Sequence, residues 1–223
     1  SGLKTAETPA RGSFVEPALL AQVTEVREVL PGLRVRLAAE PLPVWLAAEA
    51  ATGRHEEPPF WAHAWPGGLA LAKHVLERPA LVCGLRVLDF AAGCGVTGIA
   101  AALAGAAHVK ATEVDAFALA AIAQNAALNG VALEVRREDV IGRDDAWDVV
   151  LVGDVFYEDE LSRRVLAWLR ALARRGARVL VGDPGRSFFP AAELHVEGEY
   201  AFPPVPAWDS VVAHTARVWS VGP

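Results

Sequence analysis

The sequence predicts an α/β protein with a doubly wound, mostly parallel sheet. Three observations support this fold class. Short apolar runs alternate with helix-like segments from Leu85 onward, a pattern typical of strands that lie parallel and are joined by helices. A glycine-rich turn joins the first of these strands to the first helix. The last two strand-like runs, Glu193–Tyr200 and Val211–Trp219, have no long helix between them, which predicts an antiparallel pair at one edge of the sheet.

The composition fits a single folded domain. Of the 223 residues, 53% are hydrophobic and 22% are charged, which excludes a disordered chain. The 21 Lys and Arg residues against 27 Asp and Glu residues give a net charge of −6, which disfavours nucleic acid as a partner. Two cysteines, Cys83 and Cys94, cannot build a disulfide scaffold and indicate a reducing compartment. We therefore expect a cytoplasmic protein that works as a monomer.

We expect three segments along the chain. Residues 1–13 are small and polar and are predicted to be a flexible end. Residues 14–68 are predicted to form an N-terminal extension or lid, and residues 69–223 the main domain. The start of the chain has no signal-peptide pattern. Phe90–Val109 is uncharged over the length of a membrane span, but its glycines favour a turn followed by a buried helix, so we expect no membrane partner.

The extension mixes short helical patterns with one strand of period two, Leu33–Leu37. A charged, proline-containing linker follows at Gly53–Pro59. Next comes an aromatic segment, Phe60–Gly68, which we expect to end in a turn at its Pro-Gly-Gly sequence. The chain then continues as an amphipathic helix over Leu69–Leu76.

The strands and helices of the main domain are expected to follow one another regularly. The predicted strands are Arg86–Phe90, His108–Glu113, Leu133–Arg136, Trp147–Gly153 and Arg178–Gly182. The predicted helices are Gly98–Ala104, Phe117–Leu128, which Asn129-Gly130 stops as a left-handed cap, and Leu161–Ala173. The strand that ends at Gly153 is the most apolar, so we expect it to be central and to lie beside the first strand.

The glycine-rich turn predicts a nucleotide-like ligand. Gly93, Gly95 and Gly98 follow a strand and open a helix in the pattern G-x-G-x-x-G, which occurs in both dinucleotide and S-adenosylmethionine sites. Asp89, four residues before Gly93, helps to separate these ligands. A carboxylate repels a pyrophosphate but favours a sulfonium and an ammonium, so we expect S-adenosylmethionine rather than NAD. Asp89 can also cap the strand end by accepting hydrogen bonds from the turn.

Acidic residues also follow the next two strands. Glu113 ends the second strand, where a carboxylate can accept hydrogen bonds from ribose hydroxyls. Asp115 is a weaker candidate for that contact and is expected to be the N-cap of the helix that starts at Phe117. After the third strand, Asp139 can accept from an adenine amino group, with the Val140 N–H beside it, or it can be a solvated loop acid.

A second group of candidate residues follows the most apolar strand. Gly153, Asp154 and Tyr157 lie where that strand ends, at the predicted topological switch point. An Asp and a Tyr three residues apart suit methyl transfer to a lysine nitrogen, because the acid can orient the amine and the ring can face its positive charge. We favour an orienting role for Asp154 over a strong general base, since a nearby carboxylate raises the pKa of an ammonium. The alternative is a helix cap followed by a core aromatic residue.

Of the aromatic residues before the main domain, we favour Trp65 over Trp61 as a cover for the ligand. His63 is expected to be a satisfied or solvated histidine. The spacing of Cys and His residues matches no metal site, and no serine-nucleophile motif is present. The arginines of the segment 163–178 are expected to form a solvated helix face that could dock an acidic partner.

With these residues in view, the chain resembles the class I methyltransferases and, more narrowly, the electron transfer flavoprotein beta-subunit lysine methyltransferases. The resemblance covers residues from about Phe14 onward. The motifs that carry it are Pro59–Gly68, Asp89–Gly93, Gly153–Tyr157, Gly182–Arg186 and the Val218-Trp219 pair.

The resemblance implies a seven-stranded sheet, S-adenosylmethionine as methyl donor with S-adenosylhomocysteine as product, and lysines of the flavoprotein beta subunit as acceptors. It also implies that Asp154 and Tyr157 fill the D-x-x-Y motif of the family beside the substrate amine. The family commonly carries an Asp where Glu113 stands, and we expect the longer carboxylate of Glu113 to reach the ribose as well. The candidate cofactor-binding residues are Trp65, Asp89, Ala91, Gly93, Gly95, Glu113, Asp139 and Gly153.

Two other functions are compatible with the sequence. The first is methylation of a different protein, ribosomal or chaperone, or of a small amine. The second is a cofactor-binding interaction module without catalysis, which would bind the cofactor and show no turnover. An NAD-dependent oxidoreductase is the poorest candidate, because of Asp89.

Overall fold

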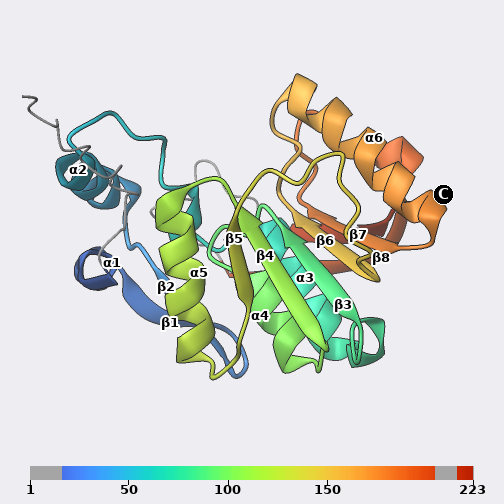
Figure 1. Cartoon of the computed structure of the whole chain (residues 1–223), viewed down its shortest axis with the longest axis horizontal. Helices are drawn as coiled ribbons and strands as arrows, with labels where there is room; N and C mark the ends of the chain where they lie inside the picture. Colours follow the sequence, from blue (N-terminus) through green and yellow to red (C-terminus); the bar gives the residue numbers. More distant parts are fainter. Residues whose placement is uncertain (1–16, 204–214, 223) are drawn as a thin grey trace, which may run out of the picture.

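A computed structural model describes residues 17–203 and 215–222 and contains a seven-stranded sheet (Figure 1). The strand order is β5-β4-β3-β6-β7-β9-β8. The first five strands in this order are parallel, and β9 pairs antiparallel with both β7 and β8. The strands are β3 Arg86–Phe90, β4 His108–Glu113, β5 Glu134–Arg137, β6 Val149–Gly153, β7 Arg178–Asp183, β8 His195–Ala201 and β9 Thr215–Ser220. The predicted fold class and antiparallel edge pair are confirmed.

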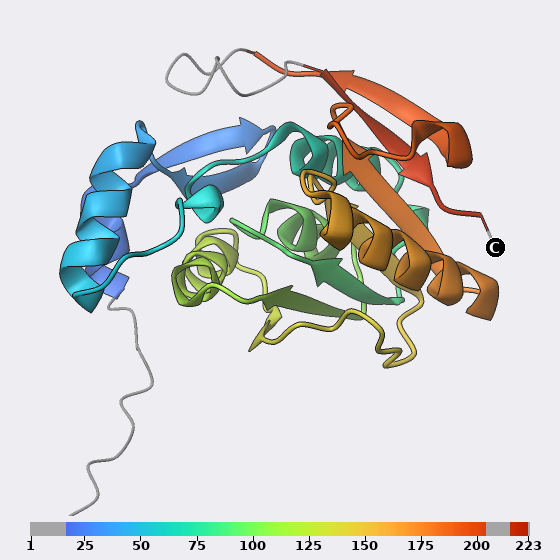
Figure 2. The ribbon, with the colours of Figure 1, turned by 90° about the horizontal axis from the view of Figure 1, so that it is seen from above.

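Helices cover both faces of the sheet, because β3, β6 and β7 alternate apolar side chains between two cores (Figures 1 and 2). Helices α3 (Pro66–Glu77) and α4 (Val96–Leu103) bury their apolar sides on one face, and α5 (Ala116–Leu128) lies beside α4. Helix α6 (Asp159–Arg175) covers the opposite face with Val165, Leu169 and Leu172. Strand β6 is buried along its length between β3 and β7, as its apolar sequence predicts.

Before the sheet, α1 (Pro17–Val23), β1 (Glu25–Leu30), β2 (Leu33–Leu37) and α2 (Pro41–Thr52) gather at one end of the molecule (Figure 2). The strand β1 was not predicted. It pairs antiparallel with β2 around Gly32, which has a φ of 76°. Its apolar residues Val26, Val29 and Leu30 do not alternate with polar ones, and the Pro31-Gly32 turn was the available signal. The predicted flexible end, residues 1–13, lies outside the described residues, as do residues 211–214 of the last predicted strand.

The prediction of a turn at Pro66-Gly67-Gly68 was wrong, because these residues form the first turn of α3. Proline is favoured there, since the first N–H groups of a helix have no partner within it. The glycines are needed for a close approach of backbones. A Cβ built on Gly67 would lie 2.2 Å from the carbonyl oxygen of Gly182, and one built on Gly153 would lie 3.0 Å from the Cα of Gly68. The start of α3 therefore lies directly against the ends of β6 and β7.

The other predicted elements are shifted by a few residues at most. The helix around α4 begins two residues earlier than predicted, and α6 is extended at both ends. Gly130 has a φ of 66° after α5, which confirms the left-handed stop. Three short 3-10 helices complete the described fold: η1 Phe60–Ala62, η2 Pro79–Leu81 and η3 Ala191–Glu193.

The uncharged stretch Phe90–Val109 is divided among the end of β3, the glycine turn, α4 and the start of β4, so the predicted turn and buried helix are confirmed. None of the helices within residues 17–203 is long and apolar enough to cross a membrane.

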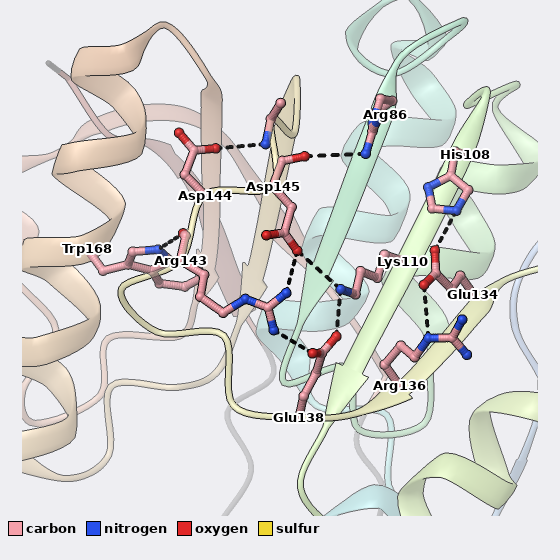
Figure 3. Close-up of polar contacts among 11 residues, drawn as sticks. Arg86, His108, Lys110, Glu134, Arg136, Glu138, Arg143, Asp144, Asp145 and Trp168 are labelled. Atoms are coloured by element: carbon pink, nitrogen blue, oxygen red, sulfur yellow. Dashed lines mark hydrogen bonds and ion pairs between the residues drawn. The ribbon is translucent and has the colours of Figure 1, made fainter.

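The segment between β5 and β6 contains no helix. A network of charged residues lies there instead, on the face of the sheet that α6 covers elsewhere (Figure 3). Lys110 of β4 has a nearly buried side chain, 11% exposed, with Nζ 2.6 Å from Glu138 Oε1 and 3.3 Å from Asp145 Oδ2. Arg143 joins the same two carboxylates, at 2.5 Å and 2.7 Å. This network attaches the connecting segment to β4, and Trp168 of α6 fixes its other side by donating to the Arg143 carbonyl oxygen.

Candidate active site at the carboxyl ends of the strands

The predicted site residues come together at the carboxyl ends of β3, β4, β6 and β7. The strand order reverses between β3 and β6, since β4 and β5 extend the sheet in one direction and β7 in the other. Loops leave such a switch point in opposite directions and open a crevice there. The glycine turn follows β3, Glu113 ends β4, and the residues after Gly153 leave β6.

The backbone of the glycine turn has three residues with positive φ: Ala91 at 52°, Gly93 at 55° and Gly95 at 82°. A Cβ at Gly93 would have open space around it, whereas one at Gly95 would lie 3.1 Å from a carbon of Ile122 in α5. Gly95 therefore serves the packing of the turn on α5. Gly93 allows the positive φ that the turn requires at this position, and the space beside it is open.

Asp89 is only 2% exposed, and its Oδ2 accepts a hydrogen bond of 2.7 Å from the Gly98 N–H. The expected cap of the strand end is therefore confirmed. A Cβ at Gly98 would lie 2.8 Å from the same oxygen, which explains the third glycine of the pattern. Burial raises the pKa of Asp89 to about 7, although the Gly98 N–H acts in the opposite direction.

Glu113 reaches back to the glycine turn. Its Oε1 accepts from the Gly93 N–H at 2.8 Å, and its Oε2 accepts from the Val114 N–H at 3.0 Å. Burial raises the pKa of this carboxyl, while the two N–H groups lower it. Asp115 has the role predicted for it, since its side chain caps α5 by accepting from the Phe117 N–H at 2.7 Å.

Asp139 follows β5 and is exposed, with a side-chain exposure of 53%. Its Oδ1 accepts from the Ile141 N–H at 2.9 Å, and its Oδ2 lies 3.8 Å from Arg164. The N–H of the preceding Glu138 donates to the Glu113 carbonyl oxygen at 3.1 Å, which places this loop next to the end of β4. The network around Lys110 secures the same loop from the other side (Figure 3).

Asp154 follows β6 in a left-handed conformation, with a φ of 59°, which is uncommon for a residue other than glycine. Its side chain is 8% exposed. Oδ2 accepts from the Gly68 N–H at 2.9 Å, at the start of α3, and Oδ1 accepts from Arg186 Nη2 at 2.8 Å. Burial raises the pKa of Asp154, and the Arg186 guanidinium and the α3 N–H groups oppose that rise. The carboxylate is therefore fixed on both oxygens.

Arg186 is the main residue that sequence reasoning missed at this site. Its guanidinium carbon lies 5.4 Å from the centre of the Trp65 ring, in a cation–π contact. Its backbone N–H donates to Asp183 Oδ1 at 2.7 Å, and so does that of Gly185. Burial raises the pKa of Asp183 to about 6. The available signal was the Gly182–Arg186 motif, which was used only as a mark of the family.

Two exposed aromatic rings and the half-buried ring of Trp65 lie close together. Tyr157 is 57% exposed and Phe60 is 54% exposed, with ring centres 6.4 Å apart. The Phe60 ring also lies 6.1 Å from that of Trp65, whose Nε1 donates to the Phe60 carbonyl oxygen at 2.7 Å. Burial and the nearby Glu113 carboxylate raise the pKa of Tyr157.

The two other residues considered in the aromatic segment belong to the interior. Trp61 is buried and stacks on Phe117 of α5, with ring centres 6.3 Å apart. His63 is buried next to Trp65, and burial lowers its pKa to about 4, so it is uncharged at neutral pH. Within the described residues, no group of three or more His, Cys, Asp and Glu side chains is arranged to hold a metal ion.

Comparison with solved structures gives the class of fold. The tRNA (uracil-54, C5)-methyltransferase of Pyrococcus abyssi, in complex with S-adenosyl-L-homocysteine, is 16% identical with a TM-score of 0.55 over 89% of this chain and 44% of the other. Magnesium protoporphyrin IX methyltransferase of Synechocystis, with the same bound product, is 15% identical with a TM-score of 0.50 over 70% and 81%. The fold is that of this class of methyltransferases.

Sequence comparison is more specific. The family model for Ribosomal protein L11 methyltransferase (PrmA) matches residues 71–153, which run from α3 to the end of β6. The electron transfer flavoprotein beta subunit lysine methyltransferase of Rattus norvegicus is 34% identical over 91% of this chain and 81% of its own length. The protein of that name from Homo sapiens is 33% identical over 95% and 85%. The chain belongs to the electron transfer flavoprotein beta subunit lysine methyltransferase family.

Proposed function

We propose that this protein transfers methyl groups from S-adenosylmethionine to lysine side chains of the electron transfer flavoprotein beta subunit. One observation carries the proposal: relatives with that named activity align over nine-tenths or more of the chain, including the loop that holds Asp154 and Tyr157. The match to the ribosomal-protein family model ends at Gly153, at the β6 end, before that loop. This match therefore supports a role of residues 71–153 in cofactor binding, and it does not favour a ribosomal protein as the substrate.

The chemistry of the glycine turn fits the proposed cofactor. Asp89, Glu113 and Asp154 bring three carboxyl groups to one edge, those of Asp89 and Asp154 buried and that of Glu113 half-buried, which suits a ligand with two positive charges and no phosphate. The open space beside Gly93 leaves room for a ligand against the backbone. We assign the ribose hydroxyls to Glu113 and the adenine edge to Asp139, which lies on the next loop. Ala91, Gly95 and Gly153 shape the backbone around the ligand, and Trp65 covers it.

S-adenosylmethionine, when bound, supplies a methyl carbon that the lysine nitrogen attacks, with the C–S bond pair passing to sulfur. The residues of this chain prepare the amine for that reaction. Asp154 accepts a hydrogen bond from the amine and orients its lone pair, since both carboxylate oxygens are already held in place. Tyr157 supplies an aromatic face beside the aliphatic part of the lysine and the positive charge that its nitrogen gains on methylation. Water takes the proton that the ammonium loses.

We also propose that residues 14–68 serve as the lid and residues 69–223 as the catalytic domain. Phe60 and Trp65 support this division, because the extension places the Phe60 ring beside both Trp65 and Tyr157. We keep the expectations of a cytoplasmic monomer that binds neither nucleic acid nor membranes. Light scattering at several protein concentrations tests the monomer, and a mass that doubles with concentration would contradict it.

The direct test is incubation of the purified chain with S-adenosylmethionine and purified flavoprotein beta subunit, followed by intact-mass and peptide mass spectrometry. We expect a mass gain in whole methyl groups, located on lysine. The catalytic variant is Asp154→Asn. Its matched control is Asp159→Asn, which changes an exposed acid at the start of α6.

Three results are distinguishable. A methylated beta subunit, made by the wild type and the control but not by Asp154→Asn, supports the proposal. An unchanged beta subunit beside another protein that gains methyl groups in a matched extract moves the activity to that substrate. Cofactor binding by calorimetry without methylation in any extract would identify a binding module instead.

A further inference from the structure

Arg186 forms an ion pair with the acid that we assign to the substrate amine. Its Nη2 lies 2.8 Å from Asp154 Oδ1, and their side chains are 21% and 8% exposed. The guanidinium also faces the Trp65 ring at 5.4 Å, and its own backbone N–H is held by Asp183. Three separate contacts therefore fix this cation beside the acid before any substrate arrives.

A fixed cation at this position bears on the protonation state of the substrate lysine. The attacking nitrogen needs a free lone pair, but a lysine is protonated at neutral pH, with an ordinary pKa of about 10.4. A buried carboxylate with no counter-ion would stabilise the ammonium and keep its proton in place. A carboxylate that already has a guanidinium partner still accepts a hydrogen bond, because each oxygen has two lone pairs. It no longer has a full negative charge to offer.

We propose that Arg186 is a positioning residue that acts through Asp154: its guanidinium neutralises the carboxylate, so that the substrate lysine binds there as an uncharged amine rather than as an ammonium. The inference deepens the proposed function and rests on it. The N–H groups at the start of α3 act in the same direction, since the positive end of a helix also reduces the charge of the acid.

Other titratable groups face Asp154 from each neighbouring element. Asp183, at the end of β7, adds a negative charge, but its Oδ1 accepts two backbone N–H groups. Cys94, in the glycine turn, has a pKa raised to about 12 and is uncharged. Tyr157 faces both Arg186 and Glu113. Arg186 is thus the cation shared by Asp154 and Asp183, and its removal would leave two buried acids facing the incoming lysine.

The test compares Arg186→Gln, which removes the charge, with Arg186→Lys, which keeps it. The matched control is Arg163→Gln, because Arg163 is a largely exposed arginine on α6. Methyl transfer to the beta subunit is measured from pH 7 to 10. For Arg186→Gln we expect the midpoint of the rise in kcat to move upward by about one to two pH units, from the loss of one unit charge nearby. Arg186→Lys should restore most of the wild-type profile.

A second readout does not depend on turnover. The Kd for the beta subunit is measured between pH 7 and 9 with S-adenosylhomocysteine bound. If the wild type accepts an uncharged lysine, its Kd falls as pH rises, by up to about tenfold per unit. Arg186→Gln should bind more tightly than the wild type at pH 7 and vary less with pH, since it accepts the ammonium directly.

The inference is overturned if Arg186→Gln lowers kcat by the same factor at every pH and weakens binding, which is the result of a purely structural role. It is also overturned if the variant is faster than the wild type at pH 7, because Arg186 would then be a blocking cation. If the wild type adds no methyl group to the beta subunit, the proposed function is wrong for that substrate. The same measurements are then made on the protein that gains mass.

Discussion

The acidic side chains at the carboxyl ends of the strands are held in different ways on the two sides of the switch point between β3 and β6. At the glycine turn, Asp89 and Glu113 are held by peptide N–H groups of the turn and its neighbours. On the other side of the switch point, Asp154 is held by a peptide N–H and also by the guanidinium of Arg186. A cationic ligand at the glycine turn would favour the charged forms of Asp89 and Glu113, whereas an acid with a cation already beside it suits an uncharged ligand. One edge of the sheet can therefore be prepared for a sulfonium and for an amine at the same time.

The largest expected effect is a loss of methyl transfer that leaves the affinity for the cofactor nearly unchanged. Asp154→Ala should lower methyl transfer by at least about a hundredfold, because the lysine loses the group that orients it. Affinity for S-adenosylhomocysteine, measured by calorimetry, should stay within roughly tenfold of the wild type, about 1.4 kcal/mol. Full turnover by this variant would remove Asp154 from the mechanism, and loss of cofactor affinity would show that the two sides of the switch point are not separate.

A second substitution tests the cofactor side through the pH dependence of stability. The pKa of Asp89 is raised to about 7 in the folded chain, so the folded state holds a proton that the unfolded state releases between about pH 4 and 7. The contribution of Asp89 to stability therefore falls as pH rises through this range. Asp89→Asn has no carboxyl group to titrate at this position. Between pH 4 and 8 its free energy of unfolding should therefore rise relative to that of the wild type by up to about 4 kcal/mol. Urea unfolding at both pH values measures this, and parallel pH curves for the two proteins would contradict it.

The amine side also depends on the contact between the start of α3 and the strand ends. A Cβ at Gly182 would lie 2.0 Å from the Gly67 carbonyl oxygen, so Gly182→Ala should cost about 3 kcal/mol in the free energy of unfolding. Gly222→Ala is the control, because nothing lies within 4 Å of its added Cβ. Equal unfolding midpoints in urea would show that the backbones can separate cheaply.

The smallest effect is expected at the helix cap behind the glycine turn. Asp115→Ala removes the acceptor for the Phe117 N–H and should destabilise the chain by about 1 kcal/mol. Methyl transfer at saturating cofactor should remain within about twofold, since Asp115 caps α5 and Glu113 holds the turn. A large loss of cofactor affinity would instead give Asp115 a direct contact with the ligand.

The main-domain strands could be predicted because buried parallel strands are apolar along their whole length, as β6 shows. The strand β1 could not, since its apolar residues Val26, Val29 and Leu30 do not follow the period of two that indicates a strand. Asp115 was assigned correctly because a cap is a local interaction between neighbours in sequence. Arg186 was missed because its role depends on Asp154, 32 residues away, and on a loop conformation that no local pattern encodes.

The glycines at the start of α3 link distant parts of the sequence. Gly67 contacts Gly182, and a Cβ on Gly153 would meet the backbone of Gly68, so none of Gly67, Gly153 and Gly182 can accept a side chain unless its opposite backbone moves away. Such positions are expected to change together or not at all during divergence. A distant homologue that keeps this fold but acts on another acceptor should therefore be recognisable by joint replacement at these sites, accompanied by a shifted helix.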